Sequence, residues 1–170
     1  MLGRFCVTCV LSFQIGSQVA VTRPSFSDFP VNKIFAGTPA APKLVTRGQR
    51  MFRTRLRAGA KAPVEFAGHY TLPRWGCGAG CNGFAIVDSV SGRVYDVPFS
   101  LVELPGTWME RYGRSDSLQR MDYRQDSRLM KINACPNEKN CGLYDYVMED
   151  GKGLKLLRKE LLPSEFQPNP

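Results

Sequence analysis

Two close pairs of cysteines constrain the fold of this chain more than any other feature. Cys77 and Cys81 enclose Gly-Ala-Gly, and Cys135 and Cys141 enclose five residues, four of them polar. Loops this short bring two sulfur atoms together, so we expect disulfides in a small domain from an oxidising compartment. Local pairing, 77 with 81 and 135 with 141, is the preferred connectivity. Cross-pairing between the two loops is the alternative.

The same cysteines admit two chemical interpretations. A zinc site would use all four thiolates, and a redox centre would use Cys77 and Cys81. Both usually need cysteines two residues apart, whereas these pairs are separated by three and five residues. The glycine-rich run from Gly76 to Gly80 also lacks the lysine of a phosphate-binding loop. We therefore expect no metal and no cofactor.

The first twenty residues have the pattern of a secretory signal. Arg4 precedes an apolar run from Phe5 to Ile15, and Ala20 offers a small residue for cleavage. The run is shorter than the roughly 20 apolar residues that cross a bilayer. Removing residues 1–20 takes away Arg4, so the net charge falls from +8 to +7. We expect a basic periplasmic or secreted protein, drawn to acidic partners, in a compartment that argues against nucleic acid.

The rest of the chain divides into three parts. Residues 21–45 are rich in proline and predict an irregular lead-in, and residues 163–170 predict a flexible tail. Residues 46–162 predict a single α+β domain, because one helical segment is followed by period-two segments joined by turns. We expect an antiparallel sheet of about five or six strands, covered by one N-terminal amphipathic helix and reinforced by disulfides.

The predicted helix covers residues 46–60, with Thr46 as a suitable N-cap. Helical spacing groups its apolar residues on one side, namely Val45, Phe52, Leu56 and Ala60. From Lys43 to Lys61 the chain has seven basic residues and no acidic one. This pattern predicts either a solvated face or a docking surface for an anion or acidic partner. The residues of that surface are Arg47, Arg50, Arg53, Arg57 and Lys61.

Period-two alternation predicts the strands. Residues 64–72 alternate so that Phe66 and Tyr70 face the core and His69 faces away from it. Residues 84–97 predict a hairpin, and residues 105–126 predict a long polar loop. Three more strands are expected over residues 127–134, 142–149 and 154–159.

The candidate site residues form two groups. One is a possible catalytic couple of Cys77 and His69, with Asp88 or Glu65 orienting the imidazole. It requires a free thiol at Cys77, which a disulfide would remove. The other group suits a protein interface, because aromatic and arginine side chains dominate interface energetics. Its members are Arg50, Arg53 and Arg57 of the helix and Trp108, Arg111 and Tyr112 of the long loop.

Two runs of sequence carry a resemblance. Residues 66–70 read Phe-Ala-Gly-His-Tyr, and residues 75–81 read Trp-Gly-Cys-Gly-Ala-Gly-Cys. Together with residues 126–129 and 141–142, they resemble a group of small exported bacterial proteins with no established activity. The resemblance covers most of residues 31–160 and implies a periplasmic or secreted location. It brings no catalytic residues.

These observations favour an exported, non-enzymatic binding protein, such as a periplasmic inhibitor or immunity-type protein with an acidic protein partner. A cysteine-dependent hydrolase or transferase using Cys77 and His69 is the first alternative. Binding of anionic membrane or cell-wall polymer through the basic helix is the second. Neither the oligomeric state nor the partner's identity follows from the sequence.

Overall fold

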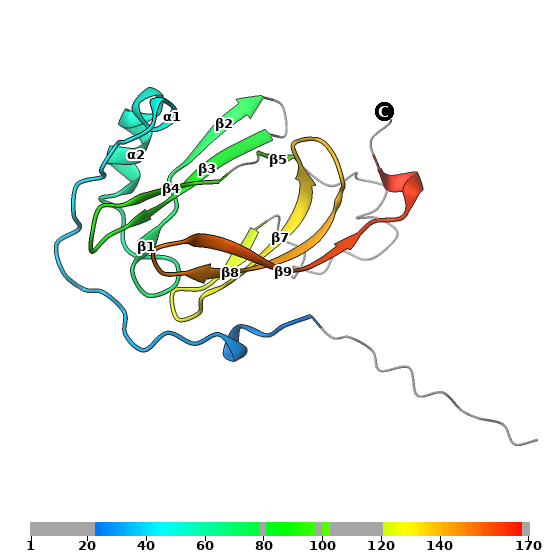
Figure 1. Cartoon of the computed structure of the whole chain (residues 1–170), viewed down its shortest axis with the longest axis horizontal. Helices are drawn as coiled ribbons and strands as arrows, with labels where there is room; N and C mark the ends of the chain where they lie inside the picture. The colour runs from blue at the N-terminus through cyan, green and yellow to red at the C-terminus, as the bar shows by residue number, and fades with distance from the viewer. Residues whose placement is uncertain (1–22, 79–80, 98–99, 103–120, 168–170) are drawn as a thin grey trace, which may run out of the picture.

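The computed structural model describes residues 23–78, 81–97, 100–102 and 121–167. The described residues form two antiparallel sheets with little helix (Figure 1). The strands are β1 (Tyr70–Thr71), β2 (Arg74–Gly78), β3 (Cys81–Asp88), β4 (Val94–Asp96), β5 (Leu101–Val102), β6 (Met121–Tyr123), β7 (Leu129–Pro136), β8 (Gly142–Glu149) and β9 (Gly153–Leu161). The strand count therefore exceeds the expected five or six.

Each sheet is organised around one long strand. In the first sheet, β1, β2 and β4 all pair antiparallel with β3. In the second sheet, β7 pairs with β6 and β8, and β8 pairs with β9. The two-residue strand β5 pairs with both β3 and β7, so it joins the two sheets along one edge.

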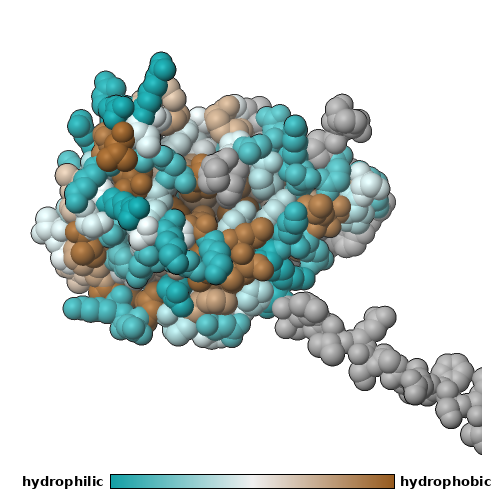
Figure 2. Space-filling view, viewed as in Figure 1, coloured by the Kyte–Doolittle hydropathy of each residue, from teal (hydrophilic) through white to brown (hydrophobic). Residues whose placement is uncertain are grey.

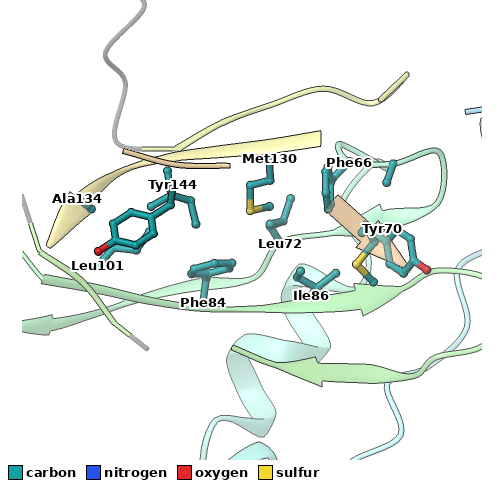
Figure 3. Packing of buried hydrophobic residues seen from close by; sticks show 12 residues of the cluster. Phe66, Tyr70, Leu72, Phe84, Ile86, Leu101, Met130, Ala134 and Tyr144 are labelled. Atoms are coloured by element: carbon teal, nitrogen blue, oxygen red, sulfur yellow. The ribbon is translucent and has the colours of Figure 1, made fainter. Parts of the chain in front are cut away.

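The main core lies between the two sheets (Figure 3). Because side chains alternate along β3, Phe84 and Ile86 point into this core. Ala85 and Val87 lie on the opposite face of β3 and are buried against the helices. The second sheet contributes residues such as Met130, and burial of such side chains stabilises the fold by about 1.5–3 kcal/mol each.

The helical region consists of two short helices rather than one. Helix α1 spans Arg47–Met51 and α2 spans Arg53–Gly59, with a break at Phe52. The predicted N-cap is confirmed, because the Thr46 side chain accepts a hydrogen bond from the Gln49 N–H in a capping box. As predicted, Leu56 is buried, but Val45 is 73% exposed because it precedes the cap.

The predicted strand over residues 64–72 is corrected to a tight loop followed by the short strand β1. Phe66 and Tyr70 form an antiparallel bridge, and the backbone between them turns through Ala67 (φ 44°) and Gly68 (φ 80°). Phe66 and Tyr70 are buried as predicted. However, the three residues between them, including His69, form a turn. The alternation of a strand therefore does not set the direction of the His69 side chain.

Two other segments also differ from expectation. Residues 121–123 of the expected long loop form β6, paired with β7. The expected tail begins with a 3₁₀ turn at Ser164–Phe166, and Phe166 packs against Cys135, Cys141 and Leu162. The hairpin predicted over residues 84–97 is confirmed as β3 and β4, and β7, β8 and β9 match the three later predicted strands.

The lead-in is irregular apart from a 3₁₀ turn at Phe26–Asp28, yet it is bound to the domain. Arg23 forms an ion pair with the buried Asp145 of β8 and donates to Asn133 of β7 at 3.1 Å. Further along, the Phe35 N–H donates to the carbonyl of Gly68 at 2.7 Å, and the Lys43 N–H donates to that of Gly92.

Both disulfides have the predicted local connectivity, Cys77–Cys81 and Cys135–Cys141. They indicate an oxidising environment outside the cytoplasm. No helix in the described part of the chain is long and apolar enough to cross a membrane.

Candidate functional site

The basic helix surface consists of the cationic side chains of α1 and α2 together with Lys61, two residues beyond α2. Phe52, Leu56 and Ala60 pack towards Ala85, Val87 and Val94 on the outer side of the first sheet, so the basic residues lie on the opposite, exposed side. Its members are Arg47, Arg50, Arg53, Arg55, Arg57 and Lys61. Figure 2 shows hydrophilic side chains projecting from the part of the molecule where these helices lie.

The charge of this surface is not neutralised by carboxylates among the described residues. Where polar partners exist, they are backbone carbonyls: the Arg50 guanidinium donates to Val45 at 2.9 Å, and that of Arg53 donates to Arg50 at 3.4 Å. Carbonyl groups orient a guanidinium without cancelling its charge. The surface therefore presents several positive charges without a carboxylate partner along two short helices.

An aromatic pair fixes the helices to the sheet. The Phe52 ring stacks on the Trp75 indole with centroids 4.3 Å apart. Beneath the indole lies Gly83, where a Cβ atom would be 2.4 Å from the indole Nε1. Gly59 likewise lies against Pro73, at a distance that leaves no room for a side chain. The positions of the arginines therefore depend on close contacts that only glycine permits.

The structure does not bring Cys77 and His69 together. Cys77 is disulfide-bonded to Cys81, so it has no free thiol. Gly78 pairs with Cys81 at the start of β3, whereas Tyr70 pairs with Asp88 at its end. The length of β3 between these two positions is about 23 Å at 3.3 Å per residue.

His69 lies between two carboxylates instead. Its Nε2 atom is 3.9 Å from Oδ1 of Asp88 and 3.9 Å from Oδ1 of Asp150. Asp88 was predicted to orient the imidazole, and the two groups are indeed neighbours. However, the Asp88 carboxylate also accepts hydrogen bonds from Ser91 Oγ (2.5 Å) and the Val90 N–H (2.8 Å), so it holds the β3–β4 turn.

Tyr70 belongs to the same cluster. Its hydroxyl donates to Asp150 at 2.8 Å. Burial, reinforced by the hydrogen bond to Asp150, raises the pKa of Tyr70 far above its usual value of about 10. The phenol is therefore neutral at physiological pH and acts as a donor to the carboxylate.

A second polar group, absent from the sequence predictions, lines a cleft between the sheets. The Tyr123 hydroxyl donates to Glu65 at 2.8 Å and accepts a hydrogen bond from Arg74, whose guanidinium is 3.6 Å from the Glu65 carboxylate. Burial and the bond to Glu65 raise the pKa of Tyr123, and Arg74 opposes this shift. The cleft has a volume of about 770 Å³, and its apolar lining includes Phe84, Leu101 and Met121.

This cleft has the size of a small-molecule site, and two of its charged groups, Glu65 and Arg74, already pair with each other. No local pattern predicts this group, because Glu65, Arg74 and Tyr123 come from separate segments that only the fold brings together. The described His, Cys, Asp and Glu residues form no group that could hold a metal ion. The remaining predicted interface residues, Trp108, Arg111 and Tyr112, lie outside the described residues.

No family model, curated protein or solved structure matches this chain. The resemblance to exported bacterial proteins therefore stays a prediction. The class of protein is defined only by the fold and the surface, as a disulfide-bonded domain of two antiparallel sheets with an exposed cationic helical region.

Proposed function

We propose that this chain is an exported, periplasmic or secreted protein that binds an acidic protein partner through the basic helix surface. One observation carries the proposal: Arg50, Arg53 and Arg57 are exposed and have no carboxylate partner in the described part of the chain. Unpaired cations held on a fixed scaffold steer anionic partners and favour the complementary surface. Inhibitor and immunity-type proteins are the classes that fit a binder of this kind.

The location forms part of the same proposal. The two disulfides support an oxidising compartment, and the N-terminal sequence pattern supports export. The enzymatic alternative is weakened, because Cys77 has no thiol to act as a nucleophile. Binding of anionic membrane or wall polymer uses the same arginines, so an experiment must separate it from protein binding.

The first test compares two triple variants of the oxidised chain for binding to poly-L-glutamate. In the helix variant, Arg50, Arg53 and Arg57 become alanine, which preserves helix propensity. In the control, the exposed residues Lys33, Arg128 and Lys139 become alanine, so the same charge is lost elsewhere. Three exposed contacts of about 0.5–1 kcal/mol each predict a ten- to hundredfold weaker binding for the helix variant. Equal losses in both variants would contradict a role for the helix.

The second test identifies the kind of partner. A photo-crosslinking amino acid replaces Arg55 in the exported chain, and the products are analysed in the source cells. Crosslinks to an acidic protein, lost in the helix variant, support the proposal. Retention on phosphatidylglycerol vesicles without a protein crosslink would instead favour the membrane alternative. Salt screens exposed charges over about 10 Å at 0.1 M, so either binding should weaken steeply with added salt.

A further inference from the structure

Two exposed apolar side chains lie within the basic helix surface. Val45, next to the Thr46 cap, and Met51, at the end of α1, are 73% and 70% exposed. No other large hydrophobic residue that the structure describes is as exposed as these two. Figure 2 shows hydrophobic surface between the hydrophilic side chains where α1 and α2 lie in Figure 1. Apolar residues surrounded by polar ones are the usual arrangement of a protein interface.

The contacts of Gln49 show which side of α1 faces away from the sheet. Gln49 is buried, and its side chain donates to the Val94 carbonyl at 3.4 Å and to Asp96 at 3.0 Å. Around the helix, Gly48 lies about 100° and Met51 about 160° from Gln49. Residues three apart are neighbours on a helix surface, so Gly48 and Met51 share one exposed side of α1.

The described residues give no structural reason for a glycine at position 48. Glycine is a poor helix former compared with alanine, yet Gly48 lies inside α1. A Cβ atom there would meet only the Thr46 Oγ1 atom, at the ordinary van der Waals distance of 3.8 Å. Glycine also permits the close approach of another molecule. The open space at Gly48, beside Met51, therefore suits an incoming side chain.

The cations around this exposed side are available to a partner. Arg47 and Arg55 are each four residues from Met51, and Arg50 directly precedes it. None of these three arginines forms an ion pair with a carboxylate in the part of the chain that the structure describes. An apolar side chain with acidic neighbours would complement both the apolar residues and the charges of this surface.

The packing of the helices favours a protein segment over a lipid surface. A helix that lies at a membrane interface buries its apolar side among the acyl chains. Here that side is already occupied, because Phe52 and Leu56 pack on the first sheet. Of the large hydrophobic residues described on the basic helix surface, Val45 and Met51 alone would be left to contact lipid.

We propose that the exposed side of α1 is the centre of the interface. Gly48 and Met51, with Val45 at the N-terminal end, receive one apolar side chain of an acidic segment of the partner protein. The acidic residues on both sides of that apolar side chain approach the neighbouring arginines. The inference rests on the function proposed above, and it adds which part of the basic helix surface selects the partner.

The test uses the full oxidised chain and three labelled peptides. The first has four glutamates on either side of a leucine, the second has serine in place of leucine, and the third has lysines in place of the glutamates. Binding is measured by fluorescence anisotropy at low salt. We expect the leucine–glutamate peptide to bind about tenfold more tightly than the serine–glutamate peptide, because its leucine is buried. The lysine peptide should not bind.

Two variants test the residues of the exposed side. Met51→Gln and Gly48→Gln should each weaken binding of the leucine–glutamate peptide about tenfold and leave that of the serine–glutamate peptide unchanged. Glutamine is uncharged and a good helix former, so neither variant should lower the Tm. Val90→Gln, the matched control, replaces an exposed apolar residue outside the helices and should leave both affinities unchanged.

The outcomes separate this inference from the proposed function. Equal affinities for the two glutamate peptides, both lowered in the helix variant, would overturn the inference and leave the proposed function standing. Affinities that the helix variant does not change would overturn both. A leucine preference that survives in both glutamine variants would also overturn the inference. If Met51→Gln weakens binding to phosphatidylglycerol vesicles but not to the leucine–glutamate peptide, the inference falls in favour of a membrane surface.

Discussion

At the scale of single residues, glycines at close approaches are the most sensitive positions. Gly92 has a φ of +73°, and a Cβ atom there would lie 2.2 Å from the carbonyl oxygen of Ala41. Gly92→Ala must therefore strain the turn and push the lead-in away, and we expect it to lower the free energy of unfolding by about 2–4 kcal/mol. Chemical denaturation of the oxidised protein measures the change.

Gly48→Ala is the matched control for this prediction. Gly48 lies in the first turn of α1, and the nearest atom to its Cβ would be 3.8 Å away. Alanine has the higher helix propensity, so this variant should be more stable by about 0.5 kcal/mol. A similar loss of stability in both variants would show that the close contact at Gly92 does not govern the effect.

Tyr70 and Tyr123 predict the behaviour of the protein at alkaline pH. Burial raises the pKa of both phenols, so the folded state keeps their protons when the unfolded chain loses them. Their contribution to stability is fully present below the unfolded pKa of about 10 and is lost as the pH rises above it. Thermal unfolding between pH 8 and 11 should show this decline. Tyr70→Phe should flatten it, and an unchanged slope would contradict the assignment.

At the scale of elements, the two disulfides should differ in their contribution. Both close short loops, for which chain entropy predicts about 2 kcal/mol each. Cys135 and Cys141 are also buried with Leu162 and Phe166, whereas Cys77 is exposed. Replacing Cys135 and Cys141 by alanine should therefore cost about 1–2 kcal/mol more than replacing Cys77 and Cys81. Urea denaturation of both double variants decides this, and equal costs would show that packing at the buried pair contributes nothing.

The elements also show what the sequence could predict. Strands β3, β4, β7, β8 and β9 follow from alternation and from turns at Gly92 and Gly151, where φ is positive. Alternation alone failed over residues 64–72, because Ala67 adopts a left-handed conformation that is rare for a residue with a side chain. The Gln125 carbonyl, distant in sequence, accepts a hydrogen bond from the Gly68 N–H at 2.7 Å. Tertiary contacts of this kind add to the local hydrogen bonds between Phe66 and Tyr70 in stabilising the turn.

The candidate site shows the same division. The arginines of the basic helix surface follow from local periodicity, because helical spacing places them opposite Phe52 and Leu56. The Glu65–Arg74–Tyr123 group depends on the pairing of both sheets, and no local pattern encodes it. Likewise, the sequence analysis considered Cys77 as a nucleophile beside His69. In the structure the two residues lie at opposite ends of β3, and the carboxylate of Asp150 lies near the imidazole instead.

At the scale of the whole molecule, the lead-in connects the two sheets. Near one end, the Arg23 side chain contacts Asn133 of β7 and Asp145 of β8. Near the other end, the Lys43 N–H donates to the Gly92 carbonyl in the turn before β4. If this connection belongs to the cooperative unit, loosening one end must lower the stability of the entire domain. If it is only an appendage, the loss must stay local. A single substitution at Arg23 distinguishes the two cases.

Arg23→Ala leaves Asp145, which is 1% exposed, with Arg158 at 3.8 Å as its one remaining ion-pair partner in the described structure. Removing one member of a buried pair costs about 3–5 kcal/mol, and because Arg23 is partly exposed we expect about 2 kcal/mol. For a domain of this size, that should lower the Tm by about 4–8 °C. Lys33→Ala, in an exposed part of the lead-in, should leave the Tm unchanged. An unchanged Tm in Arg23→Ala, together with faster exchange of only the Val31 and Phe35 amides, would show that the lead-in unfolds separately from the sheets.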